Sequence, residues 1–158
     1  MSTQASQEFV ERMGSALSQA GLPRIPSLVF AALLVDDDGR MTASELARTL
    51  HLSAGSISGA VRYLEQVGMA RRERERGSRR DVYVVDDDAW HGAMMRTGQV
   101  YAPMIAALTR GLTTIGDDAA AHRRLLLTRE FLSFVDEEMA ALAGRWEKRR
   151  AEIVGTYD

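Results

Sequence analysis

The sequence contains no cysteine, so it can form neither a disulfide bond nor a metal site built from thiolates. It also lacks any apolar run near the roughly 18 residues that a membrane-spanning helix requires. Its first residues show no charged start followed by an apolar stretch, so we expect no signal peptide. These absences favour a cytoplasmic globular protein that has no membrane partner.

Motifs of enzymatic chemistry are absent as well. The histidines at positions 51, 91 and 122 stand apart, and none belongs to an H-E-x-x-H zinc motif. There is no G-x-G-x-x-G or phosphate-binding loop sequence, and no elbow that would present a serine nucleophile. Two aspartate triplets, 36–38 and 86–88, lack calcium-loop spacing, so a metal site is the less favoured interpretation of each. We expect no catalytic residues, no cofactor and no metal.

The net charge of −2 is the sum of three regions of different sign. Residues 1–39 carry 2 basic and 5 acidic side chains, residues 40–80 carry 9 and 4, and residues 81–158 carry 9 and 13. The middle region therefore has a net charge of +5 and lies between two acidic regions. Such a local positive field is typical of a surface that binds nucleic-acid phosphates.

The start of the basic region predicts two helices joined by a tight turn. Thr42 stands three residues before Glu45, which is the spacing of a capping box, and predicts a first helix over residues 43–50. Ser53 is placed to cap a second helix, and Gly68 occupies the left-handed position that commonly ends one. The apolar stripe of the second helix consists of Ile57, Ala60, Val61 and Leu64.

The opposite face of the second helix carries small and polar residues. Gly55 and Gly59 lie there, and each glycine inside a helix costs about 0.8–1.0 kcal/mol relative to alanine. Ser56, Ser58 and Arg62 complete the face. Small residues, hydroxyls and one arginine suit close approach to the floor of a DNA major groove. A plain solvated face is the alternative.

An arginine-rich hairpin follows the two helices. Residues 71–81 hold six arginines and three acids, Gly77 and Ser78 mark a turn, and residues 82–85 predict the returning strand. Residues 40–42 are expected to form a short strand against the base of this hairpin. A basic hairpin tip can enter a minor groove or bind phosphates.

Three consecutive patterns in this stretch resemble the winged-helix domain of MarR-type bacterial repressors. They are T-x-x-E-L-A, then S-x-x-x-I-S-x-x-V-R-x-L-E-x-x-G, then R-R-E-R-E-x-G-S-R-R-D-x-Y. The resemblance covers roughly residues 8–90 and is greatest to the branch that includes GbsR-like proteins and actinobacterial regulators of exporter genes. It implies a mainly α fold with a small β-hairpin wing, in which long helices form a dimerisation domain.

The resemblance also implies a function. It predicts a sequence-specific DNA-binding transcription regulator, a ligand-responsive repressor of exporter or stress genes that binds an inverted-repeat operator as a homodimer. The alternative, from another class, is a winged helix that serves only as a protein-interaction module and does not read DNA sequence.

The expected domains follow from these patterns. Residues 22–88 form the winged helix-turn-helix domain, and residues 5–21 with 89–155 form the helical dimerisation domain. Pro103 lies within the long helix that starts near Ala89, and we expect a kink there because proline removes one backbone hydrogen bond.

The residues expected to bind double-stranded DNA have three roles. Thr42 and Ser53 would bind phosphates near helix starts, and the second helix would enter the major groove. The hairpin tip would reach the minor groove or its phosphates, where Asp81 would orient a neighbouring arginine. The full set is Thr42, Ser53, Ser56, Ser58, Gly59, Arg62, Arg76, Arg79 and Arg80.

The helices outside the winged helix carry the remaining predictions. The last helix is apolar on more than one side, which favours a dimer interface; the alternative is the far side of a monomeric bundle. Residues expected at the interface are Phe9, Met13, Leu127, Phe131, Val135, Met139, Leu142 and Trp146. MarR-like proteins commonly hold a small ligand between their two domains, and this resemblance implies that a small apolar effector would contact Trp90, Met94, Met95, Tyr101 and Met104.

Overall fold

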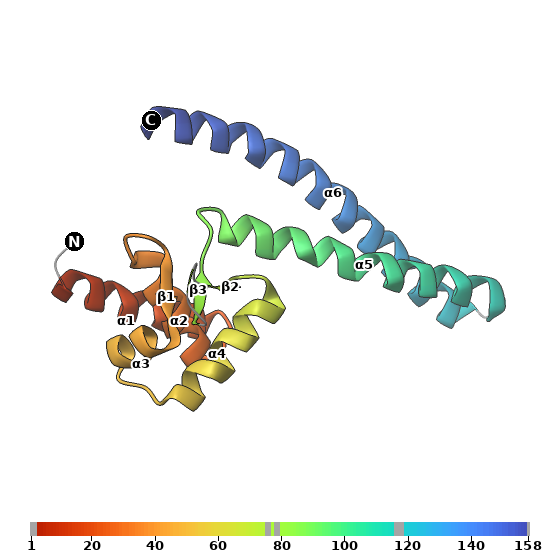
Figure 1. Cartoon of the computed structure of the whole chain (residues 1–158). Helices are drawn as coiled ribbons and strands as arrows, with labels where there is room; N and C mark the ends of the chain where they lie inside the picture. Colours follow the sequence, from red (N-terminus) through yellow and green to blue (C-terminus); the bar gives the residue numbers. More distant parts are fainter. Residues whose placement is uncertain (1–2, 75–76, 78–79, 116–118, 158) are drawn as a thin grey trace. The chain divides into compact units, whose positions relative to one another are not determined.

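The computed structural model describes residues 3–74, 77, 80–115 and 119–157. These residues form helices and one small sheet (Figure 1). The chain divides into two compact units, Met1–Gly92 and Ala93–Asp158, and each is described by itself below. Within the described ranges, no helix is long and apolar enough to cross a membrane.

Two helices at the start of the first unit pack closely on each other. They are α1, Thr3–Gln19, and α2, Arg24–Val35. A Cβ atom added at Gly14 of α1 would stand 2.7 Å from Leu28 Cδ2 of α2, so the Leu28 side chain would have to shift to admit a larger residue there. Gly14 therefore permits the close contact between α1 and α2.

Helix α2 is the central helix of the first unit, and its sequence is almost uniformly apolar. It begins at Arg24. Proline is tolerated at Pro26 because the N–H groups of a first helical turn have no partner inside the helix. Leu34 is 38% exposed, whereas seven other residues of α2 are buried. The buried residues of α2 are Pro26, Ser27, Val29, Phe30, Ala31, Ala32 and Leu33.

The helix-turn-helix consists of α3, Ala43–Leu50, and α4, Ala54–Val67. Both lie where the capping residues predict them. Leu46 of α3 is fully buried, and so is the predicted apolar stripe of α4. The stripe residues Ile57, Ala60, Val61 and Leu64 are at most 3% exposed. Burial of these side chains against α2 fixes which face of α4 remains outside.

A three-stranded antiparallel sheet completes the first unit. Its strands are β1, Arg40–Thr42; β2, Arg71–Arg74; and β3, Asp81–Val84, in the order β1-β3-β2. The expected strand at residues 40–42 pairs with β3, with Met41 opposite Tyr83. The sheet thus ties the start of α3 to the base of the hairpin.

The second unit contains most of α5, Ala89–Thr114, and all of α6, Ala119–Tyr157. Helix α5 continues through Pro103, and α6 continues to Tyr157. Leu125 of α6 lies 3.7 Å from the position of a Cβ atom at Gly111, so the two helices are in contact near their junction.

Candidate nucleic-acid interface

A capping box fixes the start of α3. The Thr42 N–H donates to Glu45 Oε2 at 2.8 Å, and the Glu45 N–H donates to Thr42 Oγ1 at 3.2 Å. The Thr42 hydroxyl also lies 2.7 Å from Glu45 Oε2. These backbone and hydroxyl bonds lower the pKa of the Glu45 carboxyl from its ordinary value, with a smaller contribution from the positive charges of Arg48 and Arg80.

The turn between α3 and α4 has a left-handed residue at its first position. His51 ends α3 with φ 52° and ψ 40°, a conformation that is uncommon for residues other than glycine. Ser53 then caps α4, since its hydroxyl accepts from the Ser56 N–H at 3.2 Å. Gly68 ends α4 at φ 74°, as its position predicts. The capping chemistry at both ends thus holds α4 in place.

The outer face of α4 contains the residues expected to read DNA. Ser58, Gly59 and Arg62 are exposed, and Ser56 is half-buried. A Cβ atom at Gly59 would meet nothing within 4 Å, and one at Gly55 would meet only Ser53 Oγ at 3.9 Å. Packing among the described residues therefore requires neither glycine. The structure leaves this face open to a partner.

The wing arginines divide into two groups, and the first is held by acids of the first unit. Arg71 Nε donates to Asp86 at 3.0 Å, and its guanidinium also contacts Glu73. Arg40 of β1, on the far side of β3, lies 3.4 Å from Glu73. These pairs form at the base of the hairpin, where they tie its strands to the start of the following segment.

Arg72 is held by contacts with two acids and one aromatic ring of the first unit. It lies 3.3 Å from Glu65 of α4 and 3.5 Å from Asp81 of β3. Its guanidinium stands 5.9 Å from the centre of the Tyr83 ring. The hydrogen bond that Arg72 donates to Glu65 raises the pKa of Arg72. The same ion pair joins α4 to the wing. Asp81 pairs with Arg72, whereas Arg76 and Arg79, which are expected at the hairpin tip, lie outside the described residues.

The remaining wing arginines are exposed or lie outside the described residues. Arg74 and Arg80 are both exposed. Within the described part of the chain, no acid pairs with Arg74. The two residues predicted to reach the minor groove, Arg76 and Arg79, lie outside the described residues. Their role stays a prediction.

A polar hollow at the start of α3 brings together residues that sequence reasoning had not grouped. It has a volume of about 420 Å³, and Thr42, Ser44, Arg48 and Arg80 are among the residues that line it. Arg80 comes from the far end of the wing, so only the sheet pairing of β1 with β3 places it here. Arg48 could not be predicted from the sequence, because its spacing from Thr42 matches no recognised motif.

The residues expected to contact an effector belong to both units. Trp90 is 43% exposed and packs edge-on against the buried Phe30, with ring centres 5.8 Å apart. Met104 is 45% exposed and Tyr101 is half-buried in the second unit. The side chains of Met94 and Met95 lie outside the described residues. The effector site therefore stays a prediction.

The apolar stripe expected at a dimer interface is exposed on the single chain. Leu127, Phe131 and Leu142 are 59%, 63% and 39% exposed, and Phe134 beside them is 59% exposed. The other members of the expected interface are half-buried. They are Phe9, Met13, Val135, Met139 and Trp146. An apolar surface of this kind on a helix is typical of a surface that another chain covers.

Comparison with known proteins identifies similar sequences in both units. Residues 20–81 match the model of the MarR family, and residues 88–149 match that of MmpR5-like MarR family transcriptional regulators. HTH-type transcriptional regulator MmpR5 of Mycobacterium tuberculosis is 30% identical over 92% of this chain and 88% of its own length. A crystal structure of a transcriptional regulator superposes with a TM-score of 0.79 at 29% identity, covering 91% of this chain and 99% of the other.

Proposed function

This chain belongs to the MarR family of transcriptional regulators, and from that premise we propose how it acts on DNA. It is a winged-helix transcription regulator that binds DNA in a sequence-specific manner. We infer that it represses transcription by occupying an inverted-repeat operator as a homodimer. Two copies related by a two-fold axis would place one α4 in each of two successive major grooves.

The observation that carries this proposal is the outer face of α4. Ser58, Gly59 and Arg62 are exposed, and a Cβ atom added at Gly59 would meet no atom of the described residues within 4 Å. In the proposed complex, Arg62 donates to base edges, because the fork of a guanidinium matches the two acceptors of guanine. Ser56 and Ser58 lie on the same helix and would contact bases or nearby phosphates.

Phosphates would bind near the N-terminal ends of α3 and α4. The hollow at the start of α3 presents Ser44, Arg48 and Arg80 beside the N-terminal end of α3, where backbone N–H groups favour an anion. The Ser53 hydroxyl lies at the start of α4 and would serve a second phosphate. Arg76 and Arg79 would extend the contact from the hairpin tip to the minor groove.

The genes under control and the effector rest on the family resemblance alone. We propose that the protein controls exporter or stress genes, and that a small apolar molecule near Trp90, Tyr101 and Met104 releases it from DNA. The M. tuberculosis relative supports the actinobacterial branch of our prediction, whereas the GbsR-like branch rests on the sequence patterns. A repressor of chromosomal genes would work in the cytoplasm and needs no catalytic activity.

A salt series on duplex binding tests the proposal. Each phosphate contact releases counterions, so the logarithm of the association constant should fall linearly and steeply as the logarithm of salt concentration rises. Binding should also be tighter to one operator than to random duplex. An affinity for duplex that does not respond to salt would contradict the proposal and favour a winged helix used only for protein interaction.

The variant Arg62→Ala tests the assignment of base reading to α4. It should weaken operator binding by about 1–3 kcal/mol and leave random duplex nearly unchanged. The matched control is Arg12→Ala, which removes an exposed arginine of α1 that pairs with Glu8. Equal weakening on both duplexes would instead assign Arg62 to a phosphate.

A further inference from the structure

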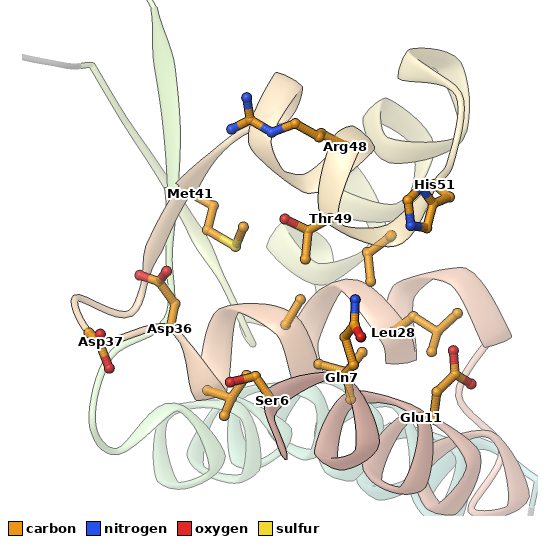
Figure 2. A pocket seen from close by; sticks show the side chains of 14 residues that line it. Ser6, Gln7, Glu11, Leu28, Asp36, Asp37, Met41, Arg48, Thr49 and His51 are labelled. Atoms are coloured by element: carbon orange, nitrogen blue, oxygen red, sulfur yellow. The ribbon is translucent and has the colours of Figure 1, made fainter. Parts of the chain in front are cut away.

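A cavity of about 630 Å³ lies inside the first unit, away from the outer face of α4. Figure 2 shows it between α1 and α2 on one side and the end of α3 on the other. Its apolar lining includes Val10 of α1, Leu28, Ala32 and Val35 of α2, and Met41 of β1. We name it the α1–α3 cavity. Its volume lies within the range of roughly 300–1,000 Å³ that is usual for small-molecule sites.

The edge of the α1–α3 cavity has an excess of acidic side chains. Glu11, Asp36 and Asp37 line it, together with one arginine, Arg48, and with His51. In Figure 2, Asp36 and Asp37 lie on the opposite side of the cavity from Glu11 and His51. A molecule in the cavity therefore meets carboxylates at both ends.

Two observations indicate that the acidic side chains dominate the charge at the edge of the cavity. Asp36 is fixed in place, because its Oδ1 accepts from the backbone N–H groups of Asp38 at 3.2 Å and Arg40 at 3.1 Å. Within the described residues, neither Glu11 nor Asp37 has an ion-pair partner.

We propose that the α1–α3 cavity binds a small organic cation with an apolar body. The apolar body would lie against Val10, Leu28 and Val35. This contact would be favourable because it removes apolar surface from water. The cationic group would lie beside Asp37 or Glu11, where a carboxylate favours it. This site differs in place and in ligand charge from the apolar effector site proposed near Trp90.

Occupancy of the cavity would act on DNA binding through the turn before α4. Leu50 and His51 line the cavity, and His51 is the left-handed residue that joins α3 to that turn. A ligand that contacts His51 would change the position of α4 relative to α2. This effect rests on the proposed DNA-binding function, whereas the binding of the cation does not.

Three probes of one shape and different charge test the site. They are phenylbutylamine, phenylbutanol and phenylbutyrate, titrated into the full chain by isothermal calorimetry near neutral pH. The amine should bind more tightly than the alcohol, and the alcohol more tightly than the carboxylate. No binding of any probe, or an alcohol that binds as tightly as the amine, would overturn the proposal.

The double variant Glu11→Gln with Asp37→Asn locates the cation. Each lost carboxylate should weaken amine binding by about 2–5-fold, a range typical of exposed ion pairs, and leave alcohol binding unchanged. Both residues are exposed, so the variant should fold. The control Glu8→Gln removes an exposed acid of α1 that pairs with Arg12 and does not line the cavity. Unchanged amine affinity in the double variant would overturn the site.

Duplex binding in the same experiment separates this inference from the proposed function. Saturating amine should shift the operator affinity of the wild-type protein, and the shift should shrink in the double variant. If the protein without amine bound no duplex at all, the proposed function would fail, while the ranking of the three probes would still decide the cavity. An amine that binds without shifting operator affinity would overturn the link through His51.

Discussion

Thr42 and Glu45 hold the first turn of α3 by two reciprocal hydrogen bonds, one from each backbone N–H to the other side chain. The same two residues border the polar hollow that we assign to a phosphate. The cap therefore links the stability of the helix-turn-helix to the geometry of the DNA contact.

Replacing Thr42 with alanine should lower the free energy of unfolding by about 1 kcal/mol, because the Glu45 N–H loses its acceptor. Thr42→Ser keeps the hydroxyl and should retain most of the stability. Urea unfolding followed by circular dichroism measures both. Equal stability of the alanine and serine variants would contradict the cap.

Glu45 should contribute to stability in a pH-dependent way. Its pKa is lowered from the ordinary value of 4.5, first by the backbone N–H of Thr42 and then by its hydroxyl. Because the folded pKa lies below the unfolded one, the contribution is present above about pH 4.5 and is lost as pH falls through the folded value.

Comparison of wild type with Glu45→Gln at about pH 6 and about pH 3 measures this contribution. The carboxylate of Glu45 stabilises the fold only while it is charged, and glutamine carries no charge at either pH. The difference in unfolding free energy should be larger at the higher pH. A difference that stays constant across this range would show that the charge of Glu45 is irrelevant.

The substitution Gly59→Ala should stabilise the free protein and weaken DNA binding. Alanine favours the helix by up to about 1 kcal/mol, and the added methyl group meets no atom of the described residues within 4 Å. In the complex, the same methyl group would lie against DNA, at a cost of about 1–3 kcal/mol if that contact is closely packed.

Gly144→Ala is the matched control, because Gly144 is an exposed glycine inside α6 with nothing within 4 Å of its added Cβ atom. It should raise the melting temperature without changing operator affinity. If both variants gained stability and retained full affinity, α4 would not approach DNA at Gly59.

The exposed apolar residues of α6 lead to a prediction about assembly. Phe131→Glu places a charge on a residue that is 63% exposed in the single chain, so it should leave the fold intact and prevent dimerisation. Sedimentation velocity should change from dimer to monomer, and operator affinity should fall. Thr128→Glu, one turn earlier and also exposed, is the control for added charge. A wild-type protein that is already monomeric at micromolar concentration would contradict the predicted interface.

The helix-turn-helix was predictable because its signals are local. Thr42 with Glu45, Ser53 and Gly68 mark ends of α3 and α4 within a few residues, and the structure confirms each. The start of α2 is harder to predict, because a proline in a first helical turn resembles a helix boundary when only the sequence is read.

The site was less predictable because its partners come from distant parts of the chain. Arg72 reads as one of six similar arginines, yet Glu65, Asp81 and Tyr83 hold it within the protein. Its partner Glu65 lies on α4, and no spacing rule connects a helix to a later strand. The α1–α3 cavity was missed for the same reason, since α1, α2, β1 and α3 each contribute only part of it.

Selection of bound sequences from a random duplex library tests the central claim most directly. A dimer that places two α4 helices in successive major grooves should enrich an inverted repeat whose half-sites are centred about 10 bp apart. The same selection with Arg62→Ala should lose preference at a symmetric pair of positions. Enrichment of no sequence, or of a single half-site without symmetry, would contradict the account of this protein as a dimeric reader of DNA.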